Sequence, residues 1–156
     1  MKVFHTSRMV VRHPNVSFSR DALDFGKGFY VTKLRDQAMV YAEKFHFRGL
    51  SAILNVYELD DGWLKWHVRR FDSYNELWLD FVAANRKGLP VESFDAVEGG
   101  IANDKVFRTL DLYFSGDISK VDALKRLCYE QPNHQICLLN QQLIDNHLYF
   151  LSSEEL

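Results

Sequence analysis

The sequence has few of the features that mark several large classes of protein. Its 156 residues include only two cysteines and three prolines, and no apolar run is long enough to cross a bilayer. Cys128 and Cys137 do not form a metal-type pair, and so low a cysteine content suits a reducing compartment. No apolar signal-peptide segment follows Met1. These absences predict a cytoplasmic protein without a membrane segment.

An excess of charge of either sign is also absent. Lys and Arg number 19 against 21 Asp and Glu, which gives a net charge of −2. No general positive field therefore attracts the chain to nucleic acid or anionic lipid. The net charge does not exclude a local basic patch, or a nucleotide as the target of a reaction. A hydrophobic content of 47% and an aromatic content of 14% predict a folded globule, and the length predicts one domain over 1–156.

Several short strands are mixed with helices along the chain, without βαβ alternation, and this pattern indicates an α+β fold. Two strands are expected at 51–59 and 64–71, joined as a hairpin by the turn signal Asp60-Asp61-Gly62. Ser73 and Glu76 have the spacing of a capping box, which predicts a helix from Ser73 to Arg86.

A glycine-rich segment, residues 24–32, is the most distinctive stretch. Gly26 and Gly28 flank one lysine and allow a backbone or a ligand to come close, because neither has a Cβ. The residues that follow predict a short strand containing Tyr30, and then a helix with Tyr41 eleven positions later. A strand that turns directly into a helix can bring both tyrosines to one cleft, where two aromatic rings hold a flat heteroaromatic ligand. Two core tyrosines beside a glycine-rich loop are the simpler alternative.

The string Phe25–Tyr30, with a second tyrosine one helix further on, resembles the nicotinamide-binding segment of ADP-ribosyltransferases of the diphtheria-toxin and poly(ADP-ribose) polymerase type. Those enzymes have a His–Tyr–Glu signature on three separated strands. The same residues also resemble an uncharacterised bacterial domain family placed in that clan. The resemblance implies a split pair of small antiparallel sheets with helices around them and NAD in a central cleft, in contact with Gly28, Tyr30 and Tyr41.

The first signature position matches the segment Phe4–Arg8. The resemblance implies that His5 hydrogen-bonds the adenosine ribose and that the backbone of Thr6 holds the nicotinamide carboxamide, with Ser7 nearby. On the residue alone, a structural histidine is the favoured interpretation of His5. Arg20 is the candidate for the pyrophosphate, because a guanidinium matches phosphate oxygens bidentately; a solvated surface arginine is the alternative.

The third signature position departs from the family pattern. The segment Asn133–Leu139 matches the late strand, and Gln135 stands where the glutamate would be. A carboxylate there would hold the 2′-hydroxyl and stabilise an oxocarbenium-like ribose, whereas an amide supplies only a dipole. Loss of one aligned electrostatic partner typically costs ~10²–10³ in rate. Glu130, Glu98 and Asp104 are alternative sources of the charge, among which the sequence does not choose.

Two residues are candidates for contact with the acceptor. Asn133 occupies the position that in the relatives helps to orient the acceptor. Asn103 or Asp104 is expected to cap a helix, worth ~1 kcal/mol, and the alternative places Asp104 at the rim of the cleft. Ala38 stands where polymerase-type relatives have a serine that donates to the carboxamide, so that hydrogen bond is absent.

The leading hypothesis is transfer of ADP-ribose from NAD to an unidentified acceptor, with release of nicotinamide and with His5, Tyr30 and Gln135 as the catalytic residues. NAD is then a co-substrate, and no metal is expected. The acceptor can be a protein, a nucleic acid or a small molecule. The resemblance further implies a toxin-like effector that a partner protein neutralises. Two alternatives stay open: NAD hydrolysis, and a non-catalytic module that binds NAD, ADP-ribose or a protein.

Overall fold

Two β-sheets and five α-helices make up the fold, which a computed structural model describes for all residues from Met1 to Leu156. The first sheet has the strand order β1 (Lys2–Ser7), β3 (Ile53–Leu59) and β7 (Leu148–Glu155). The second has the order β2 (Phe29–Val31), β6 (Gln135–Leu138), β5 (Ala96–Gly99) and β4 (Val68–Arg70). The α+β class is confirmed. All pairs are antiparallel except β4 with β5, which is parallel and so departs from the expected all-antiparallel sheets.

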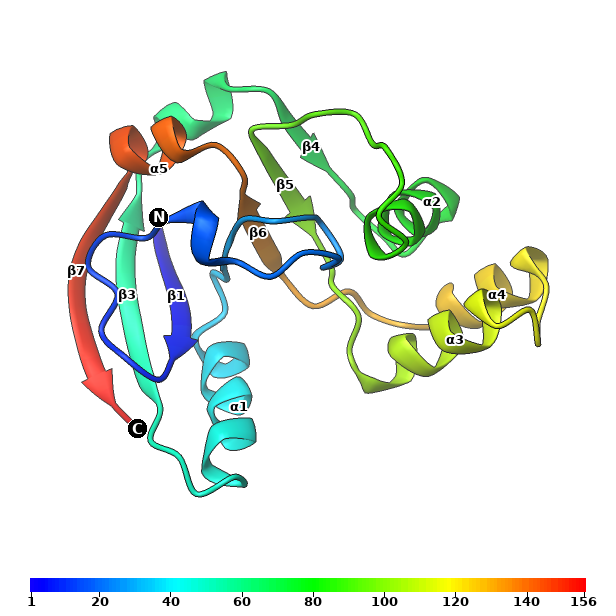
Figure 1. Ribbon diagram of the computed structural model, residues 1–156, viewed down its shortest axis with the longest axis horizontal. Helices are drawn as coiled ribbons and strands as arrows, with labels where there is room; N and C mark the ends of the chain where they lie inside the picture. The colour runs from blue at the N-terminus through cyan, green and yellow to red at the C-terminus, as the bar shows by residue number, and fades with distance from the viewer.

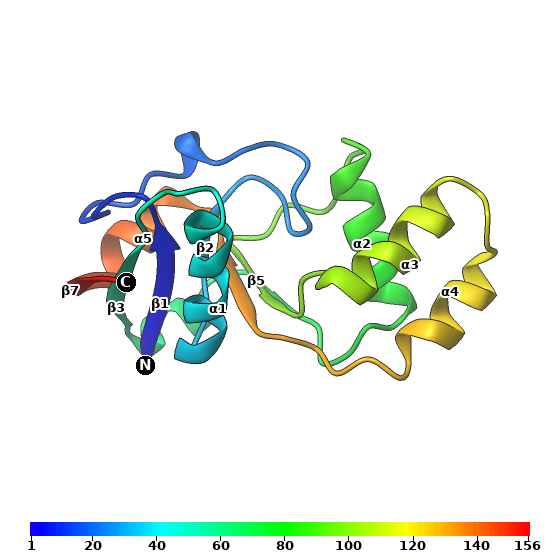
Figure 2. The ribbon, with the colours of Figure 1, turned by 90° about the horizontal axis from the view of Figure 1, so that it is seen from below.

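The helices lie in two groups (Figures 1 and 2). Beside the first sheet are α1 (Arg35–His46) and α5 (Gln141–His147), whereas α2 (Glu76–Arg86), α3 (Asp104–Phe114) and α4 (Lys120–Leu127) lie together on the far side of the second sheet. Short 3-10 helices η1 (Val16–Phe18) and η2 (Asp61–Lys65) lie in the connections. No helix has the length and apolar character that a transmembrane span requires.

Two hydrophobic clusters share the second sheet: the first includes residues of α5, and the second includes residues of α2, α3 and α4. Ile136 and Leu138 of β6 belong to one cluster, together with Val3 and Tyr57 of the first sheet. Cys137, between them, belongs to the other cluster, with Trp78 and Leu110 as buried members from α2 and α3. This alternation is the two-residue period of a strand, so β6 is apolar on both faces and buried on both.

The two sheets meet where β1 passes the end of β2. Phe4 N–H donates to Thr32 O at 2.8 Å, and Thr32 N–H donates to Phe4 O at 3.0 Å. This single antiparallel bridge is the only pairing between the sheets. We call the region around it the β1–β2 seam, and it includes the corner from β2 into α1.

The predicted hairpin at Asp60-Asp61-Gly62 is wrong. Asp60 Oδ1 accepts from Gly62 N–H at 2.8 Å and caps η2, and Trp63 is buried in the first cluster. The chain therefore leaves β3 and crosses to the other sheet, where β4 pairs with β5. An Asx-type turn and a 3-10 cap use the same Asp-x-Gly signal as a hairpin turn, and burial of Trp63 favours the crossing.

The expected start of α2 is also wrong by two residues. The N-cap is Asn75 rather than Ser73; the Asn75 Oδ1 accepts from Trp78 N–H at 3.0 Å, and the helix begins at Glu76. The cap of α3 is confirmed as Asn103, whose Oδ1 accepts from Val106 N–H at 2.9 Å. In both helices an asparagine, which is among the best N-caps, takes the position.

Candidate functional site

His5 lies at the β1–β2 seam, against the backbone of Tyr30. Its Nδ1 is 2.7 Å from Tyr30 O, and its ring centroid is 4.4 Å from that of Phe29. A carbonyl oxygen only accepts, so Nδ1 carries the proton and Nε2 is left as a free acceptor. Desolvation by burial lowers the pKa of His5, and the bond to Tyr30 opposes this only in part. The imidazole is therefore neutral at pH 7 and presents one lone pair.

The phenol of Tyr30 is held by the glycine-rich loop that precedes its own strand. Its hydroxyl donates to Gly26 O at 2.7 Å and accepts from Phe25 N–H at 3.1 Å. Burial raises the pKa of Tyr30 far above its usual value, so the hydroxyl stays protonated. The ring packs against the second cluster, on the opposite face of β2 from Phe29 and the His5 imidazole. The seam thus joins His5 to the main chain of Tyr30, not to its ring.

Helix α1 docks on the end of β1 through Thr6. Thr6 is buried, and its Oγ1 donates to Ala38 O at 2.7 Å. Tyr41 follows Ala38 by three residues, which places it on the neighbouring part of the same helical face. Its ring is 44% exposed and makes an edge contact with Phe45 at 5.7 Å. Lys44 Nζ lies over one face of this ring, 5.1 Å from its centroid, so the opposite face is the one available to stack on a ligand.

A side-chain amide fastens α1 to the start of β6. Gln37 Nε2 donates to His134 O at 2.8 Å, and His134 N–H donates to Gln37 Oε1 at 2.9 Å. This two-bond clamp fixes the residue directly before Gln135. Gln37 and Tyr41 are four residues apart on α1, so the clamp brings the helical face that carries Tyr41 to the strand that carries Gln135.

Gln135 lies on the same face of the second sheet as Tyr30. Cys137 pairs with Tyr30, and Gln135 is two residues before Cys137, so all three side chains project to one side. The Gln135 side chain is partly exposed and makes no hydrogen bond within the chain. Its amide is therefore available to a ligand.

Glu98 is the most strongly engaged of the three acids considered as a replacement charge. It pairs with Ile136 of β6, so it projects to the opposite face from Gln135. His134 Nε2 lies 2.9 Å from Glu98 Oε1, and Arg70 Nε lies 2.9 Å from Oε2. The hydrogen bond from His134 and the charge of Arg70 lower the pKa of Glu98, which keeps it ionised. Glu130 is partly exposed, without an ion pair, and Asp104 is exposed at the start of α3.

Ser7 and Asn133 have hydrogen-bonding atoms that are occupied in the structure. Ser7 Oγ donates to Met9 O at 2.6 Å and accepts from Asn55 Nδ2 at 3.1 Å. Asn133 Oδ1 accepts from Ile101 N–H at 2.7 Å, which leaves its Nδ2 free. Ile101 is three residues before Asp104, but no hydrogen bond or ion pair joins the Asp104 side chain to Asn133 or to Gln135.

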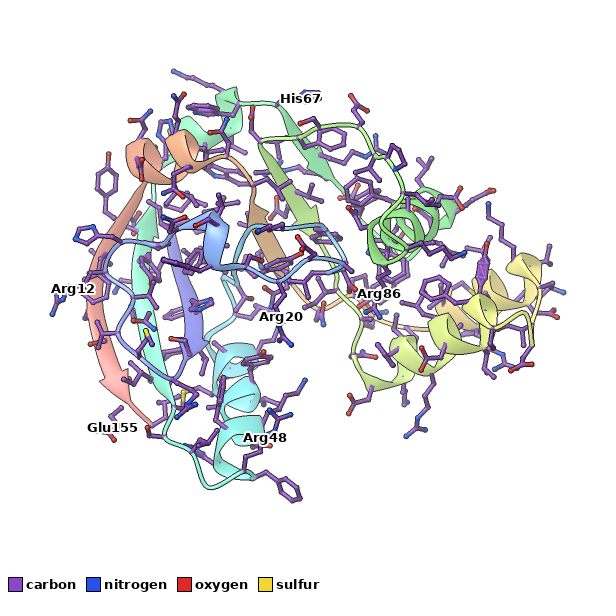
Figure 3. All side chains as sticks on the ribbon, viewed as in Figure 1. Arg12, Arg20, Arg48, His67, Arg86 and Glu155 are labelled. Atoms are coloured by element: carbon purple, nitrogen blue, oxygen red, sulfur yellow. The ribbon has the colours of Figure 1, made fainter.

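Gly28 and Arg20 belong to the segment that connects β1 with β2. A Cβ on Gly28 would lie 2.6 Å from both Cys137 Sγ and Leu138 O, so this glycine is required by the close approach of β6. The close approach of β6 therefore explains why this residue is a glycine, and no ligand is needed to explain it. Arg20 is exposed, and no hydrogen bond or ion pair holds its guanidinium; its side chain lies near the middle of the view in Figure 3.

Sequence reasoning missed Gln37 and His134. His134 is 9% exposed; its Nδ1 accepts from Lys33 N–H at 3.1 Å, and its Nε2–H therefore donates to Glu98. His134 directly precedes Gln135 in the sequence, and this neighbouring position is the signal by which it could have been found. No sequence signal singled out Gln37, because an amide that pairs with a distant backbone leaves no local pattern.

No group of three or more His, Cys, Asp or Glu residues is arranged to hold a metal.

Comparisons with known proteins give one match. No curated protein and no solved structure matches the chain. The model of a family described as "Protein of unknown function (DUF3990)" matches residues 1–150, nearly the whole chain. The chain that forms this seam therefore belongs to the DUF3990 family.

Proposed function

We propose that this chain binds NAD at the β1–β2 seam and transfers ADP-ribose to an acceptor, with release of nicotinamide. The proposed fold is the ADP-ribosyltransferase type, split at the seam between the two sheets. The observation that supports the proposal most is the convergence of separate backbone segments there, although the His5 and Gln135 side chains lie on opposite faces of the second sheet. Hydrogen bonds join His5 to Tyr30, Thr6 to the helix of Tyr41, and that helix to the residue before Gln135. These are the positions that match the transferase signature.

Each group has a property that suits its proposed role. The free Nε2 of neutral His5 can accept a hydrogen bond from a ribose hydroxyl. The exposed ring of Tyr41 offers a stacking surface for nicotinamide, and the free amide of Gln135 can hold the hydroxyl of the nicotinamide ribose. Arg20 is an unpaired cation on the connecting segment and is the proposed partner of the pyrophosphate.

The chemistry that this arrangement would support is displacement at C1′ of the nicotinamide ribose. The C1′–N bond breaks and nicotinamide leaves with the bonding pair, while a lone pair of the acceptor forms the new bond to C1′ and the acceptor proton passes to solvent. Gln135 contributes a dipole rather than a charge to the cationic transition state. The rate is therefore expected to depend mainly on how NAD is positioned. In the best cases, positioning alone lowers an activation barrier by about 7 kcal/mol or more.

The test is nicotinamide release from NAD by the purified chain, with and without a cell lysate that contains acceptors. Tyr41→Ala is expected to lower the release rate at limiting NAD by ~10-fold, since loss of a stacked ring costs about 0.5–1.5 kcal/mol beyond the area that it buries. Tyr129→Ala is the matched control, because Tyr129 is a tyrosine 86% exposed, beyond the end of α4. The control should release nicotinamide at the wild-type rate.

Other outcomes identify the alternatives. Release without labelling of any lysate component indicates that water takes the place of the acceptor. If the chain binds NAD without releasing nicotinamide, and Tyr41→Ala abolishes the binding, the chain is a non-catalytic module. The uncharged side chain of Gln135 favours this alternative. Absence of NAD binding refutes the proposal.

A further inference from the structure

A pocket of about 500 Å³ opens beside the seam, where β4 and β5 end and β6 begins. Its polar lining residues are Lys33, Arg70, Asp72, Glu98, Asn133 and His134. The pocket also touches Gly99, the residue that pairs with Gln135 in the sheet. A volume of this size is typical of small-molecule sites, for which roughly 300–1,000 Å³ is usual.

The guanidinium of Arg70 is fixed in direction at the wall of this pocket. Its Nε is 2.9 Å from Glu98 Oε2, and its Cζ lies 5.7 Å from the ring centroid of Trp63. Glu98 is in turn held by the Nε2–H of His134. Because only the Nε–H of Arg70 is engaged, its two terminal nitrogens are left without a partner. A pre-oriented guanidinium of this kind binds phosphate or carboxylate oxygens bidentately.

Two further donors on the pocket wall lack acceptors. The Nζ of Lys33 makes no hydrogen bond or ion pair, and the Nδ2 of Asn133 is free because only its Oδ1 is used. Lys33, Arg70 and Asn133 come from three different strand ends and face one pocket. Three unpaired donors, two of them cationic, match the several acceptor oxygens of a phosphate group.

The pocket also presents acceptors. Asp72 is exposed without a partner, and Glu98 has lone pairs beyond its two present bonds. Carboxylates in nucleotide sites bind sugar hydroxyls, as an acidic residue does for the ribose of dinucleotides. A ligand that combines a phosphate with hydroxyls satisfies both sets. The net charge of −2 for the whole chain disfavours a long polyanion.

We propose that this pocket binds a sugar phosphate, free or as part of a mononucleotide, with the phosphate on Lys33 and Arg70 and the hydroxyls on Asp72 and Glu98. Since Asn133 and His134, the two residues before Gln135, line the pocket, the ligand would be the acceptor of the transfer and would reach Gln135 around the end of β6, because the Gln135 side chain projects from the other face of the sheet. That second statement rests on the proposed function, whereas the binding itself does not.

The test is direct titration by calorimetry, without NAD, with ribose 5-phosphate, inorganic phosphate, ribose and adenosine 5′-monophosphate as probes. Ribose 5-phosphate is expected to bind with a dissociation constant of ~1 mM or below, more tightly than phosphate, and ribose not measurably. The double variant Lys33→Gln, Arg70→Gln should weaken binding by ~10-fold or more. Tighter binding of the adenosine nucleotide than of ribose 5-phosphate identifies the nucleotide as the source of the phosphate.

The control is Lys105→Gln, Arg108→Gln, which removes the same charges from α3, where neither residue forms an ion pair. It should leave the affinity within about 2-fold of wild type. If the Arg70 variant unfolds, Lys33→Gln alone serves, because that side chain is exposed and unpartnered. No binding of ribose 5-phosphate at ~10 mM, equal losses in both double variants, or tighter binding of a single-stranded oligonucleotide would each overturn the proposal.

A competition titration separates this proposal from the proposed function. Saturating NAD should leave the affinity for ribose 5-phosphate unchanged if the pocket lies beside the dinucleotide. Displacement by NAD would show that the pocket is part of the dinucleotide site, which contradicts the assignment as acceptor site. Binding of ribose 5-phosphate by a chain that does not bind NAD would refute the proposed function and leave the pocket assignment intact.

Discussion

Glu98 shows how its surroundings, and not its residue type, decide what a side chain does. In the comparison with the transferase signature, it is one of three acids that could supply the charge of the glutamate for which Gln135 stands. In the structure it projects from the other face of the sheet and is paired with His134 and Arg70. Through its ion pair, Glu98 orients Arg70. The surroundings of Gly28 also decide its role: the sequence predicts that a ligand comes close to this glycine, whereas in the structure β6 does.

The pairing of Glu98 predicts a pH dependence of stability. His134 and Arg70 lower the folded-state pKa below that of the unfolded chain. The stabilisation is therefore complete above the unfolded pKa, about 4.3, and is lost as the pH falls through the lower folded value. Glu98→Gln should lower the free energy of unfolding by ~1–2 kcal/mol at pH 7, and this deficit should shrink as the pH falls below about 4.3 and through the folded pKa of Glu98.

Urea unfolding across this pH range measures the effect. Glu130→Gln is the control, since Glu130 forms no ion pair, and its stability should run parallel to that of wild type at every pH. A constant deficit of Glu98→Gln over the whole range would contradict the ionic character of the cluster.

At the scale of elements, the helices that the sequence places correctly are those with a local signal. The start of α3 follows from Asn103, and the strand of Tyr30 follows from its aromatic and β-branched residues. The hairpin prediction is wrong because a turn signal specifies a local bend but does not specify which sheet the next strand joins. The predicted start of α2 is wrong because Ser73 and Asn75 are both good caps, and in the structure it is Asn75 that accepts from Trp78 N–H.

A cap variant tests this revised start of α2. Asn75→Ala should lower the free energy of unfolding by ~1 kcal/mol, because Trp78 N–H loses its acceptor. Ser73→Ala should change it by less than about 0.5 kcal/mol. Chemical denaturation of the two variants provides the comparison, and equal effects would argue for the capping box that the sequence indicates.

At the scale of the whole molecule, the two sheets are joined by the Phe4–Thr32 bridge and by α1, which contacts β1 and the residue directly before β6. Thr6 bonds the helix from the first sheet, and Gln37 bonds it to His134 at the second. The seam is therefore held by few hydrogen bonds, and one amide of α1 fixes the residue directly before Gln135.

Removal of this amide should loosen the seam. Gln37→Ala is expected to lower the free energy of unfolding by ~1–2 kcal/mol, the usual worth of two neutral hydrogen bonds. It should also speed amide hydrogen exchange at His134 and in β6 more than elsewhere. Gln142→Ala on α5 is the control, because the Gln142 side chain is exposed and makes no hydrogen bond. Uniform acceleration over the whole chain would show that the clamp contributes only to global stability.

The sequence by itself determined the α+β class, most helices and the glycine-rich strand with its two tyrosines, because propensity, periodicity and capping act within a few neighbouring residues. It also carries the resemblance to the transferase signature at His5, Tyr30 and Gln135. Only the tertiary structure decided which face of the sheet each side chain occupies, that Gln37 clamps His134, and that Glu98 directs Arg70 into a pocket. Those facts depend on strand register and on contacts between residues from about 30 to about 100 positions apart, for which a linear pattern leaves no signal.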